Sequence, residues 1–260
     1  MKSITSADNP RFRALLKLVQ SARERRTAGL SLLDGIHLVA TYAERIGTPN
    51  EIVLSRSGAE IDEVIQLLAR LNVGQVMVLP EVLFRQLSSV ATPTGIIAVV
   101  PTPRHALPQV LEGACVWLED IQDPGNVGSI LRSAAAAGIA NVCLSRHSVH
   151  AWSPRVLRAG MGAHFALRVI EGVDLLALAQ RYSGRIIATG VGSGKPVFDA
   201  DLSGEVALLF GNEGAGLSPS LAALAHETVH IPMPGHAESL NVGAAAAVCM
   251  FERVRQLRVQ

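Results

Sequence analysis

Several features are scarce in this sequence of 260 residues, and each scarcity excludes a class of protein. Charged residues make up only 17% of the chain and hydrophobic residues 49%, so the chain is not disordered. No apolar run approaches the roughly 20 residues of a membrane-spanning helix, although the mean hydropathy is +0.32. The N-terminus has no apolar segment of the signal-peptide type. We therefore expect a globular protein with no membrane partner.

Cysteine is also rare, and its placement indicates the compartment. Cys115, Cys143 and Cys249 form no Cys-x-x-Cys pair, and each lies in an apolar stretch. This usage predicts buried, reduced thiols and a cytoplasmic protein. The eight histidines include no His-Glu-x-x-His motif and no Cys/His knuckle, so we expect no metal site.

Basic residues are concentrated at the N-terminus, although the whole chain has a net charge of only +1. Residues 1–30 carry seven basic side chains against two acidic ones. Such a cluster suits contacts with nucleic-acid phosphates, and a solvated helix face has the same composition. On the first interpretation, the contacts to RNA come from Arg11, Arg23, Arg25 and Arg26.

Hydrophobic patterning divides the chain into two α/β parts. The first part opens with a helix over 10–26, capped by Asp8 or Asn9. The strands predicted next are 30–33, 51–54, 75–79 and 95–100, and the helices 36–46, 61–71 and 81–87. Three prolines within 101–108 suppress both helix and sheet and indicate a linker. The predicted domains are 1–106 and 107–260.

The second part alternates short apolar strands with helices, which predicts a parallel sheet covered on both faces. The predicted strands are 114–118, 141–144, 185–189, 206–210 and 228–231, and the helices 127–137, 154–161, 175–182 and 242–257. In such a sheet, ligands bind at loops that follow the carboxyl ends of the strands. Three segments with unusual polar residues fall at such positions.

The first two segments each follow a predicted strand. Residues 123–132 join a strand to a helix through a Pro-Gly turn; Asn126 is placed to cap that helix, and Arg132 interrupts its apolar sequence. In residues 208–217, a strand runs into three glycines and one carboxylate, Glu213. Glycines there let backbone amides approach a ligand, and many such loops are simple turns.

The third segment, residues 231–242, is a loop with two prolines before the last helix. Ser239 or Asn241 is expected to cap that helix. The polar residues of the loop lie beside Ile231 and Met233, a composition typical of the rim of an apolar pocket.

A further glycine-rich stretch, 190–196, looks like part of a P-loop. The full pattern requires glycine where Thr189 stands and serine or threonine where Pro196 stands. No Gly-x-Gly-x-x-Gly opens a helix after a strand either. The sequence therefore does not support a nucleotide hydrolase or a dehydrogenase.

Together, the three segments resemble the motifs of the SpoU (TrmH-type) RNA 2′-O-methyltransferases, a family of the SPOUT superfamily. The matching positions are Asn126 and Arg132 for the first motif, 211–217 for the second, and 231–233 with 238–242 for the third. The stretch 153–162 is also similar to the family, with glycine at 160 where serine is frequent. Gly243 departs from the family in the same way.

The resemblance implies a fold and a set of partners. The C-terminal α/β domain would hold a parallel sheet and a deep trefoil knot, and the protein would be a homodimer. The N-terminal domain, with Asn9-Pro10 and Leu33-Asp34-Gly35, is similar to the small α/β ribosomal-protein-like RNA-binding domain of many members. The implied cofactor is S-adenosylmethionine, without a metal.

The resemblance also implies roles for individual residues. The implied catalytic residues are Asn126, Arg132, Glu213, Ser239 and Asn241. The implied cofactor contacts are Thr189, Gly190, Gly211, Asn212, Glu213, Gly214, Gly216, Ile231, Met233, Leu240 and Asn241. Arg155 and Arg158, in the similar stretch 153–162, are expected to contact RNA.

The implied reaction transfers a methyl group to a ribose 2′-hydroxyl of structured RNA, and the two-domain layout favours ribosomal RNA. Family members are proposed to use the arginine of the first motif as general base. Because arginine holds its proton strongly, we expect Arg132 to fix the phosphate or ribose and to stabilise developing alkoxide charge, with Asn126 orienting Arg132. Transfer RNA as the substrate, or a non-catalytic RNA-binding factor associated with the ribosome, are the alternatives.

Overall fold

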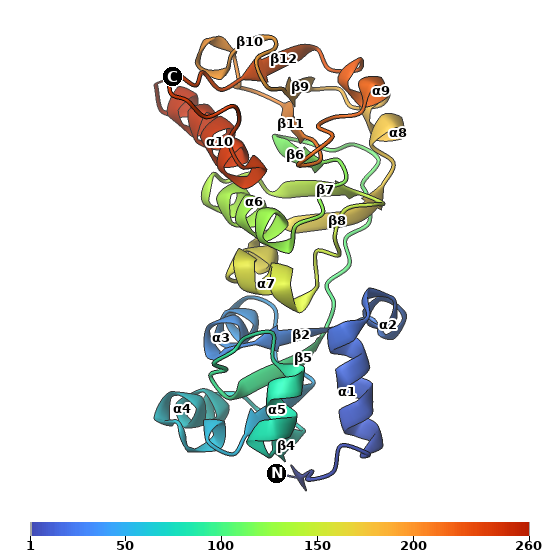
Figure 1. Ribbon diagram of the computed structural model, residues 1–260, viewed down its shortest axis with the longest axis vertical. Coiled ribbons are helices and arrows are strands. Elements are labelled where there is room, and N and C mark those ends of the chain that lie inside the picture. Colours follow the sequence, from blue (N-terminus) through green and yellow to red (C-terminus); the bar gives the residue numbers. More distant parts are fainter. Residues whose placement is uncertain (1, 260) are drawn as a thin grey trace. The chain divides into compact units, whose positions relative to one another are not determined.

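The computed structural model describes residues 2–259, which divide into two compact units (Figure 1). The first unit contains residues 2–103 together with Trp152–Phe165. The second unit contains Arg104–Ala151 and the residues from Ala166 onward. The division after Pro103 lies close to the predicted 106/107 boundary, whereas the segment Trp152–Phe165 packs with the first unit although it lies within the second part of the sequence.

The first unit is built on a five-stranded mixed sheet with the order β1-β4-β3-β5-β2. The strands are β1 (Lys2–Ser3), β2 (Leu30–Asp34), β3 (Glu51–Ser55), β4 (Val76–Leu79) and β5 (Ile96–Pro101). β5 runs antiparallel to β2 and β3, while β3, β4 and β1 are parallel. Buried side chains of the sheet, such as Val53 and Ile97, form one core with Phe12, Leu15 and Leu18.

The helices of the first unit are α1 (Pro10–Gln20), α2 (Ala22–Ala28), α3 (Ile36–Arg45), α4 (Asp62–Arg70), α5 (Glu81–Leu87) and α7 (Pro154–Gly160). The single helix predicted over 10–26 is two helices. Asn9 caps α1 by accepting hydrogen bonds from the backbone of Arg11 and Phe12. The backbone of Ser21 is extended, which ends α1, and its hydroxyl caps α2 by accepting a hydrogen bond from Glu24 N.

The second unit is built on a seven-stranded parallel sheet with the order β10-β12-β9-β11-β6-β7-β8. The strands are β6 (Cys115–Leu118), β7 (Asn141–Ser145), β8 (Arg168–Val173), β9 (Arg185–Thr189), β10 (Lys195–Pro196), β11 (Val206–Phe210) and β12 (Glu227–His230). The helices are α6 (Pro124–Ala136), α8 (Leu175–Ala179), α9 (Pro219–Ala222) and α10 (Val242–Val259). The predicted α/β class and parallel sheet are therefore confirmed. Within residues 2–259, no helix combines the length and the apolar composition needed to cross a bilayer.

Strand β8 was not predicted from the sequence. It pairs in parallel with β7 at the end of the sheet, with an irregular register between Cys143 and Ser145. Glu171 is partly exposed and Gly172 exposed, so the apolar pattern that identifies a buried strand is interrupted.

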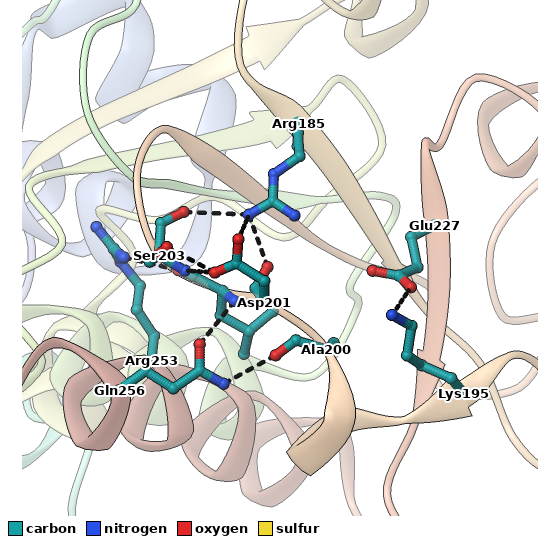
Figure 2. Close-up of polar contacts among 9 residues, drawn as sticks. Arg185, Lys195, Ala200, Asp201, Ser203, Glu227, Arg253 and Gln256 are labelled. Carbon is teal, nitrogen blue, oxygen red and sulfur yellow. Dashed lines mark hydrogen bonds and ion pairs between the residues drawn. The ribbon is translucent and has the colours of Figure 1, made fainter. Parts of the chain in front are cut away.

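Two packing arrangements in the second unit hold the elements that carry the motifs. Helices α6 and α10 lie side by side (Figure 1), and a Cβ at Gly243 would come within 3.3 Å of Ser129. The loop between β9 and β11 is fastened to α10, as Figure 2 shows for part of it. The amide of Gln256 donates to Ala200 O and accepts from Leu202 N, each at 2.8 Å, and Arg253 donates to Leu202 O at 2.7 Å.

Candidate active site

Three glycine- or proline-containing loops meet at one edge of the parallel sheet. They follow β9, β11 and β12, and in the sheet β9 lies between the other two. Because parallel strands end at the same edge, the loops 190–194, 211–217 and 231–241 emerge together. The chain segment after β6, the other neighbour of β11, leads into α6 at this edge as well.

A chain of side-chain hydrogen bonds connects the three motifs. Nδ2 of Asn126 donates to Oε1 of Glu213 at 2.9 Å. Oδ1 of Asn126 accepts from Nδ2 of Asn241 at 2.8 Å. Asn126 is buried, and both sides of its amide are used in this way. The structure thus brings together three predicted site residues that are separated by 87 and 115 positions in the sequence.

Helix termini position these side chains. Asp123, and not Asn126, caps α6: its Oδ1 accepts from Asn126 N at 2.9 Å, which corrects the expectation from the sequence. Asn241 lies just before α10, and its Oδ1 accepts from Gly243 N at 2.9 Å and from Ala244 N at 3.3 Å. Of the two expected caps of the last helix, Asn241 therefore has the role.

The carboxylate of Glu213 is held ionised by the groups around it. Partial burial raises its pKa, but hydrogen bonds from Asn126 and from the backbone of Asp123 and Gln122 outweigh this effect. The net result is a pKa below the usual value of 4.5. Glu213 is therefore a fixed acceptor at neutral pH, which orients the amide of Asn126, and not a proton donor.

The glycine-rich loop is a tight turn closed by its own backbone. Asn212 and Gly216 exchange hydrogen bonds at 3.0 and 2.9 Å, and Asn212 Oδ1 accepts from Gly214 N and Ala215 N, each at 3.0 Å. A Cβ on Gly211 would lie 2.3 Å from the backbone of Leu217, so only glycine fits there. Gly216 has a φ of +70°, in the region that favours glycine.

The other predicted cofactor residues lie along the same edge. Thr189 Oγ1 donates to Leu209 O at 2.9 Å, and Gly190 N donates to Val229 O at 2.9 Å, so the loop after β9 starts from a fixed position. Ile231 and Met233 are partly exposed, and 41% of Leu240 is exposed. This edge of the sheet therefore combines backbone polar groups with apolar side chains that are not buried in the core.

Arg132 and Ser239 stand apart from the hydrogen-bonded chain. Arg132 is exposed on α6, six residues beyond Asn126, or about 9 Å along the helix axis. Ser239 is exposed in the loop before α10. Within residues 2–259, neither side chain is hydrogen-bonded to Asn126, Glu213 or Asn241.

The pattern of residues 113–251 matches the model of the SpoU rRNA methylase family. The chain belongs to this family. It is 31% identical to the 23S rRNA (guanosine(2553)-2'-O)-methyltransferase RlmP of Bacillus subtilis (strain 168), over 96% of this chain and 98% of that protein. It is also 31% identical to the 23S rRNA (uridine(2479)-2'-O)-methyltransferase of Streptomyces viridochromogenes, over 98% of this chain and 92% of that protein.

A solved structure of a SpoU protein is similar over the whole chain. The SpoU methyltransferase AviRb from Streptomyces viridochromogenes, in complex with the cofactor AdoMet, matches with a TM-score of 0.84 at 28% identity. The match covers 97% of this chain and 100% of that chain. The resemblance to the SpoU family that the sequence motifs indicate is therefore confirmed.

Sequence reasoning missed two acidic residues that shape this site, one through its carboxylate and one through its backbone. Glu119 accepts from Ser218 N at 2.7 Å and from Ser218 Oγ at 2.6 Å, which fixes the far end of the glycine-rich loop. Asp120 has a φ of +54°, and its carbonyl accepts from Asn212 Nδ2 at 2.8 Å. Both directly follow the buried strand β6, so their position at a strand end was a signal in the sequence.

The arginines predicted to contact RNA fall into two groups. Arg11 binds the buried carboxylate of Glu51. Arg25 is itself buried, and its Nη1 donates to Leu18 O at 2.6 Å and to Val19 O at 3.0 Å. These two therefore have structural partners, and burial leaves Arg25 unable to contact RNA. The exposed members of the predicted set are Arg23, Arg26, Arg155 and Arg158.

Proposed function

We propose that this protein uses S-adenosylmethionine to methylate a ribose 2′-hydroxyl of ribosomal RNA. The observation that carries the proposal is the Glu213–Asn126–Asn241 chain, which links all three family motifs at one edge of the parallel sheet. A protein that only binds RNA has no use for an ionised carboxylate orienting two amides beside a glycine-rich loop. This arrangement favours the enzyme over a non-catalytic ribosome-associated factor.

The residues at the sheet edge fit the proposed cofactor. Partly exposed Met233 and Leu240 offer apolar contacts, and the tight turn 211–216 presents backbone without side-chain obstruction at Gly214. Thr189 and Gly190 follow from β9, which lies between the strands that lead into these two loops. When bound, S-adenosylmethionine supplies a methyl group that is activated by the positive sulfonium. The residues proposed to hold it are Thr189, Gly190, Gly211, Asn212, Glu213, Gly214, Gly216, Ile231, Met233, Leu240 and Asn241.

The chain's own residues position the acceptor. Asn126, held by Glu213, fixes Asn241 at the start of α10, and this pairing sets the spacing between α6 and α10. Arg132 donates hydrogen bonds to a phosphate or to the 2′-oxygen as negative charge develops, because the guanidinium group has only donors. Ser239 lies in the loop beside Asn241 and contributes a hydroxyl to the acceptor side. Much of the rate acceleration then comes from placement of the ribose hydroxyl.

The fold details implied by the family are part of this proposal. We propose that α10 passes through the loop between β9 and β11 as a trefoil knot, supported by the binding of Gln256 and Arg253 to the middle of that loop. A homodimer is supported by exposed apolar side chains on α10, where Phe251 is 48% and Leu257 is 46% exposed. The first unit holds the RNA, with Arg23 and Arg26 among its exposed cations.

We propose ribosomal RNA and not transfer RNA as the substrate, because the proteins that are similar over most of this chain are named as ribosomal RNA methyltransferases. The relatives named as 23S rRNA methyltransferases cover nearly the whole chain, including the first unit. By contrast, a solved structure that concerns 2-OH methylation of C/U34 on tRNA matches only 57% of this chain, with a TM-score of 0.52.

A cytoplasmic location is supported by the three cysteines, which are buried and form no disulfide. Burial raises the pKa of the Cys115 thiol to about 12.

The test is labelled-methyl transfer from S-adenosylmethionine to total RNA, followed by mass-spectrometric mapping of the modified nucleotide. The expected product is a single 2′-O-methylated nucleotide in ribosomal RNA. A methylated nucleotide in transfer RNA would show that transfer RNA is the substrate. A methyl group on a base would contradict methylation of the ribose 2′-hydroxyl. No transfer by folded protein that binds the cofactor and RNA would support the non-catalytic alternative.

A further inference from the structure

A charged groove lies between α1 and α2, away from the motif residues in the sequence. It has a volume of about 460 Å³, within the roughly 300–1,000 Å³ of small-ligand sites. We call its apolar lining residues the floor of the groove; they are Pro10, Ala14, Leu18, Ala28 and Leu30. We call its charged lining residues the rim; they are the cations Arg11, Arg13 and Lys17 and the carboxylates Asp8 and Glu24. The groove thus combines apolar residues with charged residues of both signs.

Buried hydrogen bonds fix the shape of this groove. Arg25 in α2 donates to the carbonyls of Leu18 and Val19, in the last turn of α1. Ser21 caps α2, and Gly29 ends it with a φ of +63°. Because a buried guanidinium without these partners would be costly, the angle between the two helices is held, and the groove exists before any ligand binds.

The three cations of the rim differ in their availability. Arg11 is committed to the buried carboxylate of Glu51. Arg13 pairs with Asp8, but both side chains are exposed, at 62% and 83%, and a pair of this kind contributes little and exchanges readily. Lys17 is exposed, and no carboxylate among residues 2–259 lies within ion-pair distance of it. Arg13 and Lys17, four residues apart on one helix, are therefore available to bind anions.

We propose that this groove binds one unpaired nucleotide of the RNA, with phosphates on Arg13 and Lys17 and the base on the apolar floor. The inference rests on the proposed function only in taking RNA as the partner. Unpaired bases stack on aliphatic surfaces and on arginine planes, which Pro10, Leu30 and Arg11 offer here. Glu24 on the rim accepts hydrogen bonds from N–H groups of a base edge and repels an acidic peptide.

The test measures RNA affinity of the full-length protein by fluorescence anisotropy. The probes are a labelled single-stranded RNA of mixed sequence and a fully paired hairpin of the same composition. The double variant Arg13→Ala/Lys17→Ala is compared with the matched control Arg45→Ala/Arg70→Ala, which removes two exposed arginines from α3 and α4 of the same unit. For the single strand, the slope of log affinity against log salt should fall by about 1.4 in the groove variant only.

Further measurements separate the groove from its alternatives. Glu24→Gln should weaken binding of the single-stranded RNA. Stronger binding would mean that Glu24 only repels the phosphates, and it would overturn the proposed contact between Glu24 and the base edge. An unchanged salt slope in a double variant with wild-type thermal stability would overturn the groove as an RNA site. If a polyglutamate peptide competes for the groove as strongly as the RNA does, the ligand of the groove is an acidic protein and not a nucleotide.

The outcome for the groove is distinguishable from the outcome for methyl transfer. If the groove variant loses binding while the wild type transfers no methyl group to ribosomal RNA, the groove stands and the proposed activity fails. If the wild type transfers methyl groups and the groove variant binds RNA like the wild type, the activity stands and the groove fails.

Discussion

The side-chain amide of Asn241 donates to the side-chain oxygen of Asn126 across 2.8 Å, and so links the beginnings of α10 and α6. Each of the two asparagine side chains makes a second hydrogen-bonding interaction. Asn126 binds the ionised Glu213, while Asn241 caps α10. A change in either one is therefore transmitted to the glycine-rich loop and to the last helix at the same time.

Asn126→Ala should abolish methyl transfer and lower the free energy of unfolding by about 1–3 kcal/mol, because the buried side chain of Asn126 loses two hydrogen bonds, one of them to the carboxylate of Glu213. Urea unfolding and labelled-methyl transfer check the two effects. Asn50→Ala, at an exposed asparagine of the first unit, is the matched control and should leave both unchanged. Full activity of the Asn126 variant would contradict the assigned role.

Arg132→Ala should abolish methyl transfer and leave the affinity for S-adenosylhomocysteine within a few-fold of wild type. The reason is that Arg132 lies on α6 and not in the loops proposed to hold the cofactor. Arg132→Lys should not restore full activity, because a point charge does not replace a planar fork of donors. Isothermal titration and transfer assays check this, with the exposed Arg181→Ala as control. Comparable losses of binding and turnover would place Arg132 at the cofactor instead.

Glu213 should make stability depend on pH in the acid range. Its pKa is lowered in the folded protein, so its contribution is present above the unfolded value and is lost as the pH falls through the folded pKa. In urea unfolding from about pH 6 to pH 3, Glu213→Gln should lose less stability than the wild type. Glu63→Gln, at an exposed position of α4, should follow the wild type. Parallel curves for Glu213→Gln and wild type would show that the carboxylate has no such linkage.

Gly211→Ala should lower cofactor affinity strongly, because the added Cβ would lie 2.3 Å from the backbone of Leu217 and prevent the tight turn. Titration of the full-length protein with S-adenosylhomocysteine, in the presence of a chelator, measures the effect and the independence from metal. Gly74→Ala is the control, since a Cβ there meets nothing within 4 Å. Wild-type affinity in the Gly211 variant would remove this loop from the cofactor site.

Arg25→Ala should destabilise the protein by about 1–3 kcal/mol, because two backbone carbonyls of α1 lose a buried, charged donor. Arg23→Ala, at an exposed position two residues earlier, should change stability by less than about 0.5 kcal/mol. Thermal unfolding of the two variants makes the comparison. Equal melting temperatures would show that Arg25 does not hold the α1–α2 corner.

Local patterns in the sequence were sufficient for most elements and for the motif residues. Short apolar strands alternating with helices predicted β9 and β11 with their observed bounds, and β6 and β7 with an error of one residue at one end. Strand β8 was missed because it lies at the end of the sheet and includes Glu171 and Gly172. The antiparallel direction of β5 is set by its pairing with β2 and β3, which a local pattern does not contain.

The sequence by itself determined the candidate site residues, because the three motifs that resemble the SpoU family lie in loops that follow predicted strands. Only the tertiary structure decided what each of them contacts. Asn126 loses its predicted capping role to Asp123 because the turn places that carboxylate at the first free N–H groups. Arg25 becomes a buried structural residue because α2 folds back on α1. Hydrogen bonds between residues far apart in the chain depend on which strands are neighbours, and only the packed sheet settles that order.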